Sequence, residues 1–125
     1  LKSYNPRYQV TLAVPAIDFN QVYSDRQIHE YVDLFVIMGY EFYGKNSDYA
    51  GPVAPLTGGD IWWRYDLTWA VANYKIAQIP PAKILLGLPY YGAEWRTYDP
   101  TFPSRVKPNG FVRYPMYRNI REQFG

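Results

Sequence analysis

The chain has 125 residues, 48% of them hydrophobic and 19% charged, which is enough apolar material for one folded domain and excludes a disordered chain. Thirteen Lys and Arg against eleven Asp and Glu leave a net charge of +2, too small to predict nucleic-acid binding by long-range attraction. The absence of Cys and the single histidine, His29, give no basis for a disulfide, a metal centre or a Ser-His-Asp triad, so we expect no cofactor and no metal.

The aromatic content is the unusual feature of the composition. Fourteen Tyr, six Phe and four Trp make up 19% of the chain, more than a core of this size needs. Rings in excess usually line binding surfaces for sugars, bases or peptides, and the small net charge favours a neutral ligand. No stretch approaches the roughly 18 apolar residues needed to cross a bilayer, so we expect no membrane partner.

Three short apolar runs predict β-strands near residues 9–16, 33–40 and 83–90. They read "VTLAVPA", "DLFVIM" and "ILLGLP", and they are nearly continuous rather than alternating, which is typical of parallel strands covered on both faces. Each run is closed by Pro or Gly, which favours strands over buried helix segments.

The segments between these runs are long enough for crossover helices. Residues 19–31 can hold a short helix, and residues 66–78 keep apolar residues near the 3.6-residue period, with Asp66 placed as N-cap. Pro80 and Pro81 end this second helix before the last strand. The order is therefore strand, helix, strand, long loop, helix, strand.

The long loop covers residues 44–65 and contains the pair Trp62 and Trp63. It shows two Gly-Gly or Gly-Pro turns and no helical period. A loop of this length in a compact domain is usually functional.

Alternating strands and helices predict right-handed βαβ units, in a doubly wound sheet or in a (β/α)8 barrel. Nothing resembles G-x-G-x-x-G or a P-loop, so nucleotide binding is poorly supported. The barrel better explains the polar and aromatic residues that follow each strand, because the carboxyl ends of parallel strands form the active face. These residues are Asp18, then Tyr40, Glu41 and Tyr43, then Tyr90, Tyr91, Glu94 and Trp95. Glu41 then lies among rings where binding or chemistry takes place, although a loop acid in a salt bridge is the alternative.

Four stretches follow the order of a known family. "YVDLFVIMGYEFYG" resembles the sixth barrel strand of family-18 glycoside hydrolases, the chitinases and related N-acetylglucosaminidases, where the pattern is Met-x-Tyr-Asp followed by an aromatic residue and Gly. "KILLGLPYYGAEW" is similar to their seventh strand and "VTLAVPA" to their fifth, and "AGPVAPL" resembles a Gly-x-x-Ala-Pro-Leu loop of many members. The matches cover most of residues 8–95.

The resemblance implies an α/β fold, a partial (β/α)8 TIM barrel, and hydrolysis in which the substrate's own N-acetyl oxygen attacks its anomeric carbon while a Glu donates the proton. By the resemblance, Tyr40 hydrogen-bonds the acetamido oxygen and Glu41 contacts sugar hydroxyls, so both are expected to be catalytic. Met38 matches the floor of the site, and Tyr91 and Trp95 fall on the wall and insertion region after strand seven. The full set expected to bind substrate is Met38, Tyr43, Tyr90, Tyr91, Glu94 and Trp95.

The sequence departs from the family pattern in two ways. Glu41 stands where most members have Asp, one methylene shorter. The signature Asp-x-x-Asp-x-Asp-x-Glu of strand four occurs nowhere in the 125 residues, and strand eight with its Trp is missing, so the general acid is absent from the chain.

Three parallel strands alone leave two open edges and exposed apolar surface, whereas a barrel has no edge. We therefore expect residues 1–125 to be the C-terminal half of a single catalytic barrel, completed by the remainder of that barrel or by a second copy of the chain.

Residues 96–121 hold six basic residues and one acid, interleaved with rings. This pattern is open to two interpretations. It fits an anionic polymer such as a cell-wall glycan or nucleic acid. It also fits a small insertion subdomain over residues 96–125, with a hairpin turn at Asn109 and Gly110 and a helix from Tyr114 to Phe124.

The sequence leaves three functional hypotheses. The first is a hydrolase of β-1,4-linked N-acetylglucosamine polymers, chitin or bacterial wall glycan, acting outside the cell, in the periplasm or at the cell surface, with no nucleic-acid partner. The second is a lectin-like member that binds such sugars without cutting them. The third is a small α/β interaction domain whose resemblance to the family is accidental.

Overall fold

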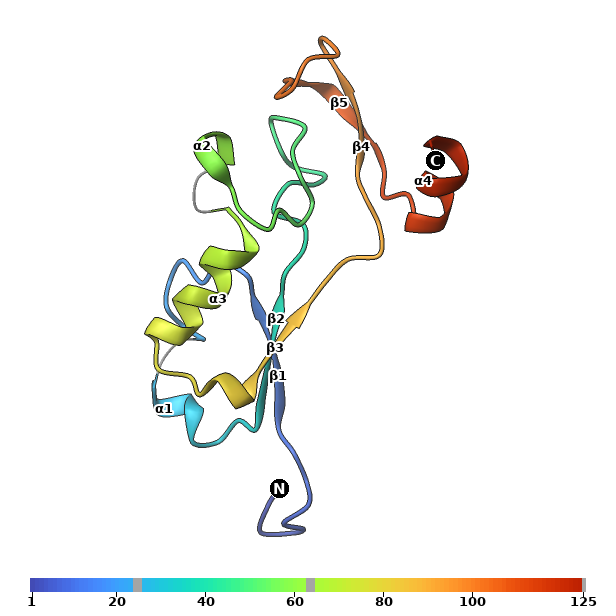
Figure 1. Ribbon diagram of the computed structural model, residues 1–125. Helices are drawn as coiled ribbons and strands as arrows, with labels where there is room; N and C mark the ends of the chain where they lie inside the picture. The colour runs from blue at the N-terminus through green and yellow to red at the C-terminus, as the bar shows by residue number, and fades with distance from the viewer. Residues whose placement is uncertain (24–25, 63–64, 125) are drawn as a thin grey trace. The chain divides into compact units, whose positions relative to one another are not determined.

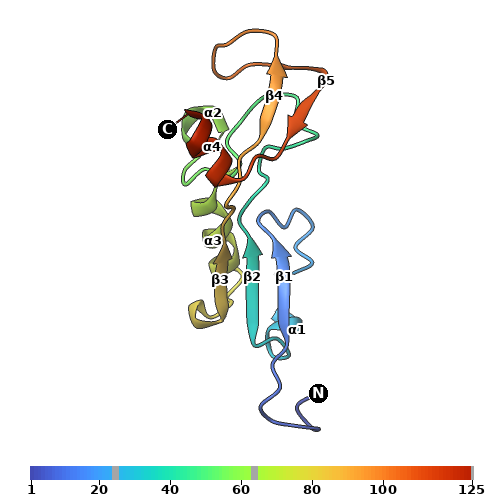
Figure 2. The same ribbon diagram turned by 90° about the vertical axis from the view of Figure 1, so that its right-hand side faces the viewer.

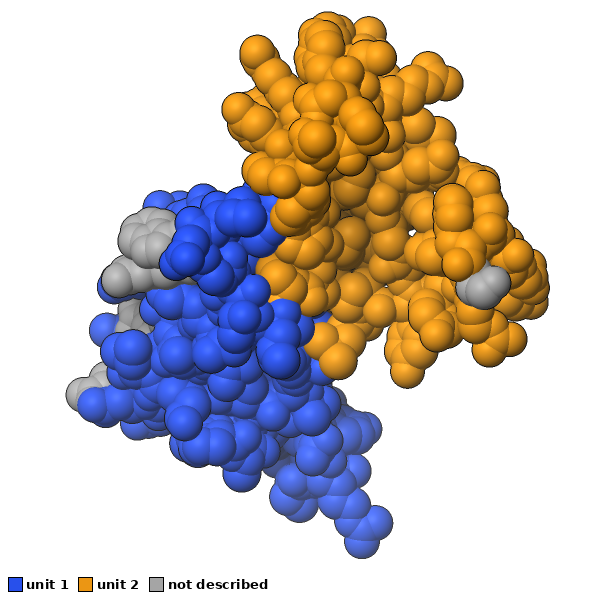
Figure 3. All heavy atoms as spheres, turned by 45° about the horizontal axis from the view of Figure 1, so that its top comes forward, with its two compact units in different colours: residues 1–39, 56–87 blue, residues 40–55, 88–125 orange. Residues whose placement is uncertain are grey.

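The computed structural model describes residues 1–23, 26–62 and 65–124, with the side chain of Arg26 left aside. The chain divides into two compact units (Figure 3). Unit 1 comprises residues 1–39 and 56–87, and unit 2 comprises residues 40–55 and 88–125. None of the described helices has the length and apolar character needed to cross a membrane.

Unit 1 is built on a three-stranded parallel sheet in the order β1-β2-β3, which confirms the three predicted strands and their direction. The strands span Thr11–Pro15, Leu34–Met38 and Ile84–Gly87, each shorter than predicted. Pro15 pairs with Met38, and Met38 pairs with Gly87, so the carboxyl ends of the strands lie level at one edge of the sheet.

One face of this sheet is covered by helices, which lie on the same side in Figure 1. Val14, Phe35 and Ile37 are fully buried there. The main covering helix, α3 (Leu67–Ile76), buries Leu67, Ala70 and Tyr74. The Tyr74 hydroxyl donates a hydrogen bond to the Pro15 carbonyl at 2.6 Å. Burial of each large apolar side chain at this face contributes about 1.5–3 kcal/mol to the stability of the fold.

The opposite face of the sheet, turned toward the viewer in Figure 2, carries no helix of unit 1. Ala13, Val36 and Leu85 are register partners across it, and the Leu85 side chain is 51% exposed. The described residues thus leave apolar surface exposed on this face, as expected for three parallel strands on their own. The second face is apolar, which explains why the strands read as continuous apolar runs rather than alternating ones.

The α3 helix confirms the prediction for residues 66–78. Asp66 is its N-cap and accepts a hydrogen bond from the Trp69 amide at 2.6 Å, while its other oxygen accepts one from the Gly58 amide at 2.9 Å. The next element is a short 3-10 turn, η1 (Pro81–Lys83). The Lys83 ammonium donates to the carbonyls of His29 and Val32, which ties this turn to the loop before β2.

The predicted helix over residues 19–31 is only partly present. Helix α1 covers Arg26–His29, and Ser24 and Asp25 lie outside the described residues. Before it, the buried Asp18 carboxylate accepts hydrogen bonds from the amides of Val22 and Tyr23 at 3.1 and 2.8 Å. These bonds hold the chain in a loop and compete with helix formation.

The loop over residues 44–65 contains a helical turn that its sequence did not predict, α2 (Gly59–Trp62). Trp63, the second member of the predicted tryptophan pair, lies outside the described residues.

Unit 2 contains an antiparallel pair, β4 (Glu94–Thr97) and β5 (Val106–Arg113), followed by helix α4 (Tyr117–Phe124). The predicted C-terminal helix is thus present but begins later than Tyr114. The hairpin turn predicted at Asn109 and Gly110 is wrong, because both residues lie inside β5. Trp95 pairs with Phe111 and Thr97 with Val106, so Arg96 alone stands opposite residues 107–110, which bulge out of the ladder.

We predict that Asp66→Ala lowers the free energy of unfolding by about 1–3 kcal/mol, because it removes the N-cap of α3 and leaves the Gly58 amide without its acceptor. Urea denaturation of the protein that carries this chain, followed by circular dichroism, measures the change. Asp60→Ala, at an exposed acid in α2, is the control and should stay within about 0.5 kcal/mol of wild type. Equal losses for the two variants would contradict the capping role.

Candidate functional site

Two segments of unit 2, beginning at Tyr40 and at Leu88, bring three of the predicted site residues into contact. The Tyr91 hydroxyl donates a hydrogen bond to Glu41 Oε1 at 3.1 Å. The Tyr40 ring lies edge-on to the Tyr91 ring, with centroids 6.4 Å apart and planes at 65°. The acid that the sequence places among rings is thus held by a phenol.

The same ring contacts continue into a row that we call the aromatic row: Tyr40, Tyr91, Tyr114, Phe111 and Trp95. Centroids of Tyr91 and Tyr114 are 5.5 Å apart, those of Tyr114 and Phe111 4.8 Å, and those of Phe111 and Trp95 6.5 Å. Tilted and edge-to-face pairs of this kind stabilise by about 0.5–1.5 kcal/mol each beyond their burial. The row therefore fixes side chains from three segments of unit 2 against one another.

The loop after Glu41 is tied to the aromatic row. The Trp95 indole N–H donates to the Gly44 carbonyl at 3.2 Å, and the Lys45 amide donates to the Tyr114 hydroxyl at 3.0 Å. A Cβ on Gly44 would come within 2.6 Å of the Tyr114 oxygen, so a larger residue here would force the Tyr114 side chain to shift. Loop and row thus form one hydrogen-bonded group.

The backbone at Glu41 is in the left-handed region, with φ of 57°, which is uncommon for a residue with a side chain. The following amide, of Phe42, donates to the Val53 carbonyl at 3.0 Å. This bond helps to hold the turn that aims the carboxylate at Tyr91.

The pKa of Tyr91 is raised to about 12, first because burial disfavours the phenolate and then because the Glu41 carboxylate is its hydrogen-bond partner and a nearby negative charge. Tyr91 therefore keeps its proton at neutral pH and acts as a donor. One oxygen of Glu41 accepts from Tyr91, and the exposed carboxylate retains capacity to accept from hydroxyl or amide groups of a ligand.

The other predicted site residues have the following surroundings. Met38 ends β2 in unit 1, level with Pro15 and Gly87. The Tyr43 ring packs against Gly51, and the Tyr90 side chain is 79% exposed. Glu94 forms an ion pair of 2.7 Å with Arg113 across the β4–β5 pair. These residues keep their predicted roles as hypotheses only.

Sequence reasoning missed Phe111 and Tyr114 as members of the aromatic row. The interleaved rings of residues 96–121 were a signal, but nothing local pairs Tyr114 with Lys45, 69 positions away. Among the described residues no three His, Cys, Asp or Glu side chains gather as a metal site would require.

Three parallel strands with helices covering one face are the arrangement of part of an α/β-barrel protein. The sequence model of the glycosyl hydrolases family 18 matches residues 1–123, and the chain belongs to this family.

Two relatives show how much of a family member the chain represents. A protein of Bacillus subtilis (strain 168) named as a sporulation-specific glycosylase is 36% identical over 93 residues, which are 70% of this chain and 20% of the relative. The class V chitinase of Arabidopsis thaliana is 29% identical over 118 residues, 82% of this chain and 29% of that protein.

Solved structures give the same picture of the fold. The family 18 chitinase of Cycas revoluta in complex with (GlcNAc)3 superposes with a TM-score of 0.74 at 19% identity, over 98% of this chain and 37% of that chain. The chitinase-like agglutinin of Robinia pseudoacacia gives 0.74 at 24% identity, over 99% of this chain and 38% of that chain. The chain thus has the fold of part of a family 18 barrel and spans less than two fifths of these proteins.

We predict that Glu41→Gln lowers the pKa of Tyr91 from about 12 toward 10, but not fully, because the charge is lost while burial, the largest cause, remains. The pKa of Tyr91 is measured by absorbance titration at the phenolate band, as the difference between the titration curves of proteins with and without the Tyr91→Phe change. Since the folded pKa lies above the unfolded one, the stability that Tyr91 contributes is complete below pH 10 and is lost as pH rises from 10 to about 12. Glu94→Gln is the matched control, and a pKa unchanged by Glu41→Gln would rule out the pairing.

Proposed function

We propose that this chain forms part of the sugar site of a glycoside hydrolase that cleaves β-1,4-linked N-acetylglucosamine polymers, chitin or bacterial wall glycan. The observation that carries the proposal is the contact of Tyr40, Glu41 and Tyr91 in a member of this family. Rings supply flat apolar faces for sugars, and the carboxylate and phenols supply hydrogen-bonding groups.

In the proposed mechanism the substrate's N-acetyl oxygen attacks the anomeric carbon, and the sugar–oxygen bond to the leaving group breaks as a general acid protonates that oxygen. The Tyr40 hydroxyl donates a hydrogen bond to the acetamido group and holds it for attack. Glu41, fixed by Tyr91, accepts from sugar hydroxyls. Met38, Tyr43, Tyr90, Glu94 and Trp95 are proposed to contact the substrate.

The general acid of this reaction is proposed to come from outside these 125 residues, because the chain has no Asp-x-x-Asp-x-Asp-x-Glu run. The exposed apolar face of the sheet supports this proposal, since a face carrying Val36 and Leu85 gains by being covered. The rest of the same barrel, or a second copy of the chain, would supply that cover. We place the activity outside the cell, in the periplasm or at the cell surface, because polymeric substrates of this kind are found there.

Binding without cleavage is the second candidate function. It is favoured by the missing acid signature and by the similarity in fold to the chitinase-like agglutinin of Robinia pseudoacacia. The same rings and carboxylate would then serve recognition alone.

The test uses the full-length protein that carries this chain and a chromogenic chito-oligosaccharide. We predict turnover, and we predict that Tyr40→Phe lowers kcat/KM by about 100-fold, because the hydrogen bond that holds the acetamido group in position for attack is lost. Tyr4→Phe, at a ring that is 94% exposed in unit 1, is the control and should leave the rate unchanged.

Two results would count against parts of this proposal. An active Tyr40→Phe variant would remove Tyr40 from the mechanism. Binding of the oligosaccharide by the unmodified protein, measured by calorimetry, without any release of chromophore would favour the lectin.

A further inference from the structure

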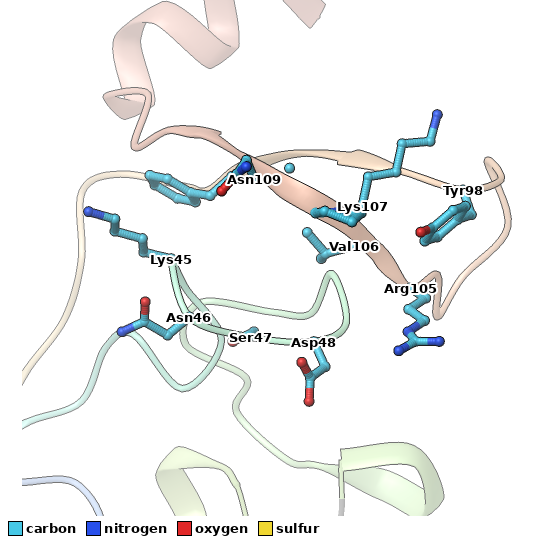
Figure 4. A pocket seen from close by; sticks show the side chains of 12 residues that line it. Lys45, Asn46, Ser47, Asp48, Tyr98, Arg105, Val106, Lys107 and Asn109 are labelled. Atoms are coloured by element: carbon cyan, nitrogen blue, oxygen red, sulfur yellow. The ribbon is translucent and has the colours of Figure 1, made fainter.

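Unit 2 contains a second feature that the proposed mechanism does not use, a hollow of about 560 Å³ beside the aromatic row. One wall is the loop of residues 45–48, and the other is the bulged part of β5 with Tyr98. Figure 4 shows this loop and β5 facing each other across the hollow. The volume lies within the range of about 300–1,000 Å³ usual for small-ligand sites.

The hollow is a built feature of the fold, because backbone hydrogen bonds join its two walls. The Val106 amide donates to the Asp48 carbonyl at 2.8 Å, and the Ala50 amide donates to the Ser104 carbonyl at 2.9 Å. Tyr49 and Arg105 form an antiparallel bridge between these bonds.

One side of the hollow is formed by residues 107–110, which include the Asn109 and Gly110 predicted to form a turn. Asn109 has a φ of 53°, and a Cβ on Gly110 would come within 2.6 Å of the Arg96 and Lys107 carbonyls. This tight packing bows residues 107–110 out of the ladder, so the bulge opens the hollow rather than closing a hairpin.

The hollow adjoins the aromatic row through shared residues. Phe111 lines it and also packs against Tyr114 and Trp95. The Lys45 side chain lines the hollow, while the Lys45 amide donates a hydrogen bond to the Tyr114 hydroxyl of the aromatic row. A sugar chain lying on the aromatic row therefore has the hollow directly beside it.

The lining of the hollow carries an excess of positive charge. Lys45, Arg105 and Lys107 stand against one acid, Asp48, and none of the three cations is ion-paired with a described carboxylate. In Figure 4, Lys45 and Asn46 lie at one end of the hollow, Arg105 and Asp48 lie toward the other, and the Lys107 side chain extends away from the loop of residues 45–48. The Lys107 ammonium sits 5.9 Å from the centroid of the exposed Tyr98 ring.

We infer that this hollow binds a carboxylate carried by the glycan, an inference that rests on the proposed function. The protein then prefers an acidic amino-sugar polymer over neutral chitin. The Lys45 ammonium offers a charged donor for such a carboxylate. The small positive excess suits a single negative charge, whereas a phosphate polymer would require more cations along its path.

The test measures the affinity of the full-length protein for two disaccharides by calorimetry at low salt. One contains N-acetylmuramic acid with a free lactyl carboxylate, and the other is the same compound with that carboxylate esterified. We expect the free acid to bind about fivefold tighter, the effect of an exposed charge pair, with the preference falling as salt is added.

Lys45→Gln should abolish this preference without changing the affinity for the ester. Arg118→Gln, which removes an exposed cation of α4 outside the hollow, is the matched control and should keep the preference.

Three outcomes would overturn the inference. Equal affinity for acid and ester, together with turnover of chito-oligosaccharides, would refute the carboxylate site and leave the proposed function standing. Tighter binding of single-stranded DNA than of either disaccharide, lost in Lys45→Gln, would make the hollow a nucleic-acid contact. Binding of neither disaccharide nor any chito-oligosaccharide would refute both proposals.

Discussion

The level ending of β2 and β3 is the constraint on which the rest of the chain depends. The Gly39 amide donates to the Gly87 carbonyl at 3.0 Å, and a Cβ on Gly39 would come within 2.7 Å of that oxygen and 2.6 Å of Leu67. Only glycine fits there, so the two strands end side by side. The segments that begin at Tyr40 and Leu88 therefore start from neighbouring points, and a few residues later Glu41 and Tyr91 share a hydrogen bond.

Features with a local cause could be predicted from the sequence, and features that depend on distant partners could not. The three strands and the Asp66 cap are set by short-range patterns, and the structure confirms them. The helix expected over residues 19–31 is shortened because the Asp18 side chain competes for backbone amides. The sequence at Asn109 and Gly110 is compatible with a turn or a bulge, and it forms a bulge because the residues on either side pair with β4. The place of Tyr114 in the site depends on a loop 69 residues earlier in the chain.

The apolar face of the sheet and the aromatic row show two different uses of hydrophobic residues. Leu85 is more than half exposed and has flexible, purely apolar atoms, so it gains free energy chiefly by being covered. The rings of the row already contact one another at their edges, and those of Tyr40, Tyr91 and Trp95 remain half-buried. A ring held by its neighbours loses little conformational freedom when a ligand binds, so a prepacked row favours recognition.

The backbone of Glu41 is held in an unfavourable conformation by its hydrogen-bonded neighbours. A non-glycine residue in the left-handed region costs about 1–3 kcal/mol, and such residues persist only where the surroundings impose them. Two hydrogen bonds impose this conformation on Glu41. The Phe42 amide donates to the Val53 carbonyl, and the Tyr91 hydroxyl donates to the Glu41 carboxylate. Glycine would relieve the strain at this position, yet it would leave the Tyr91 hydroxyl without its acceptor. The residue present thus keeps the carboxylate that Tyr91 binds, in a backbone conformation that glycine would adopt at lower cost.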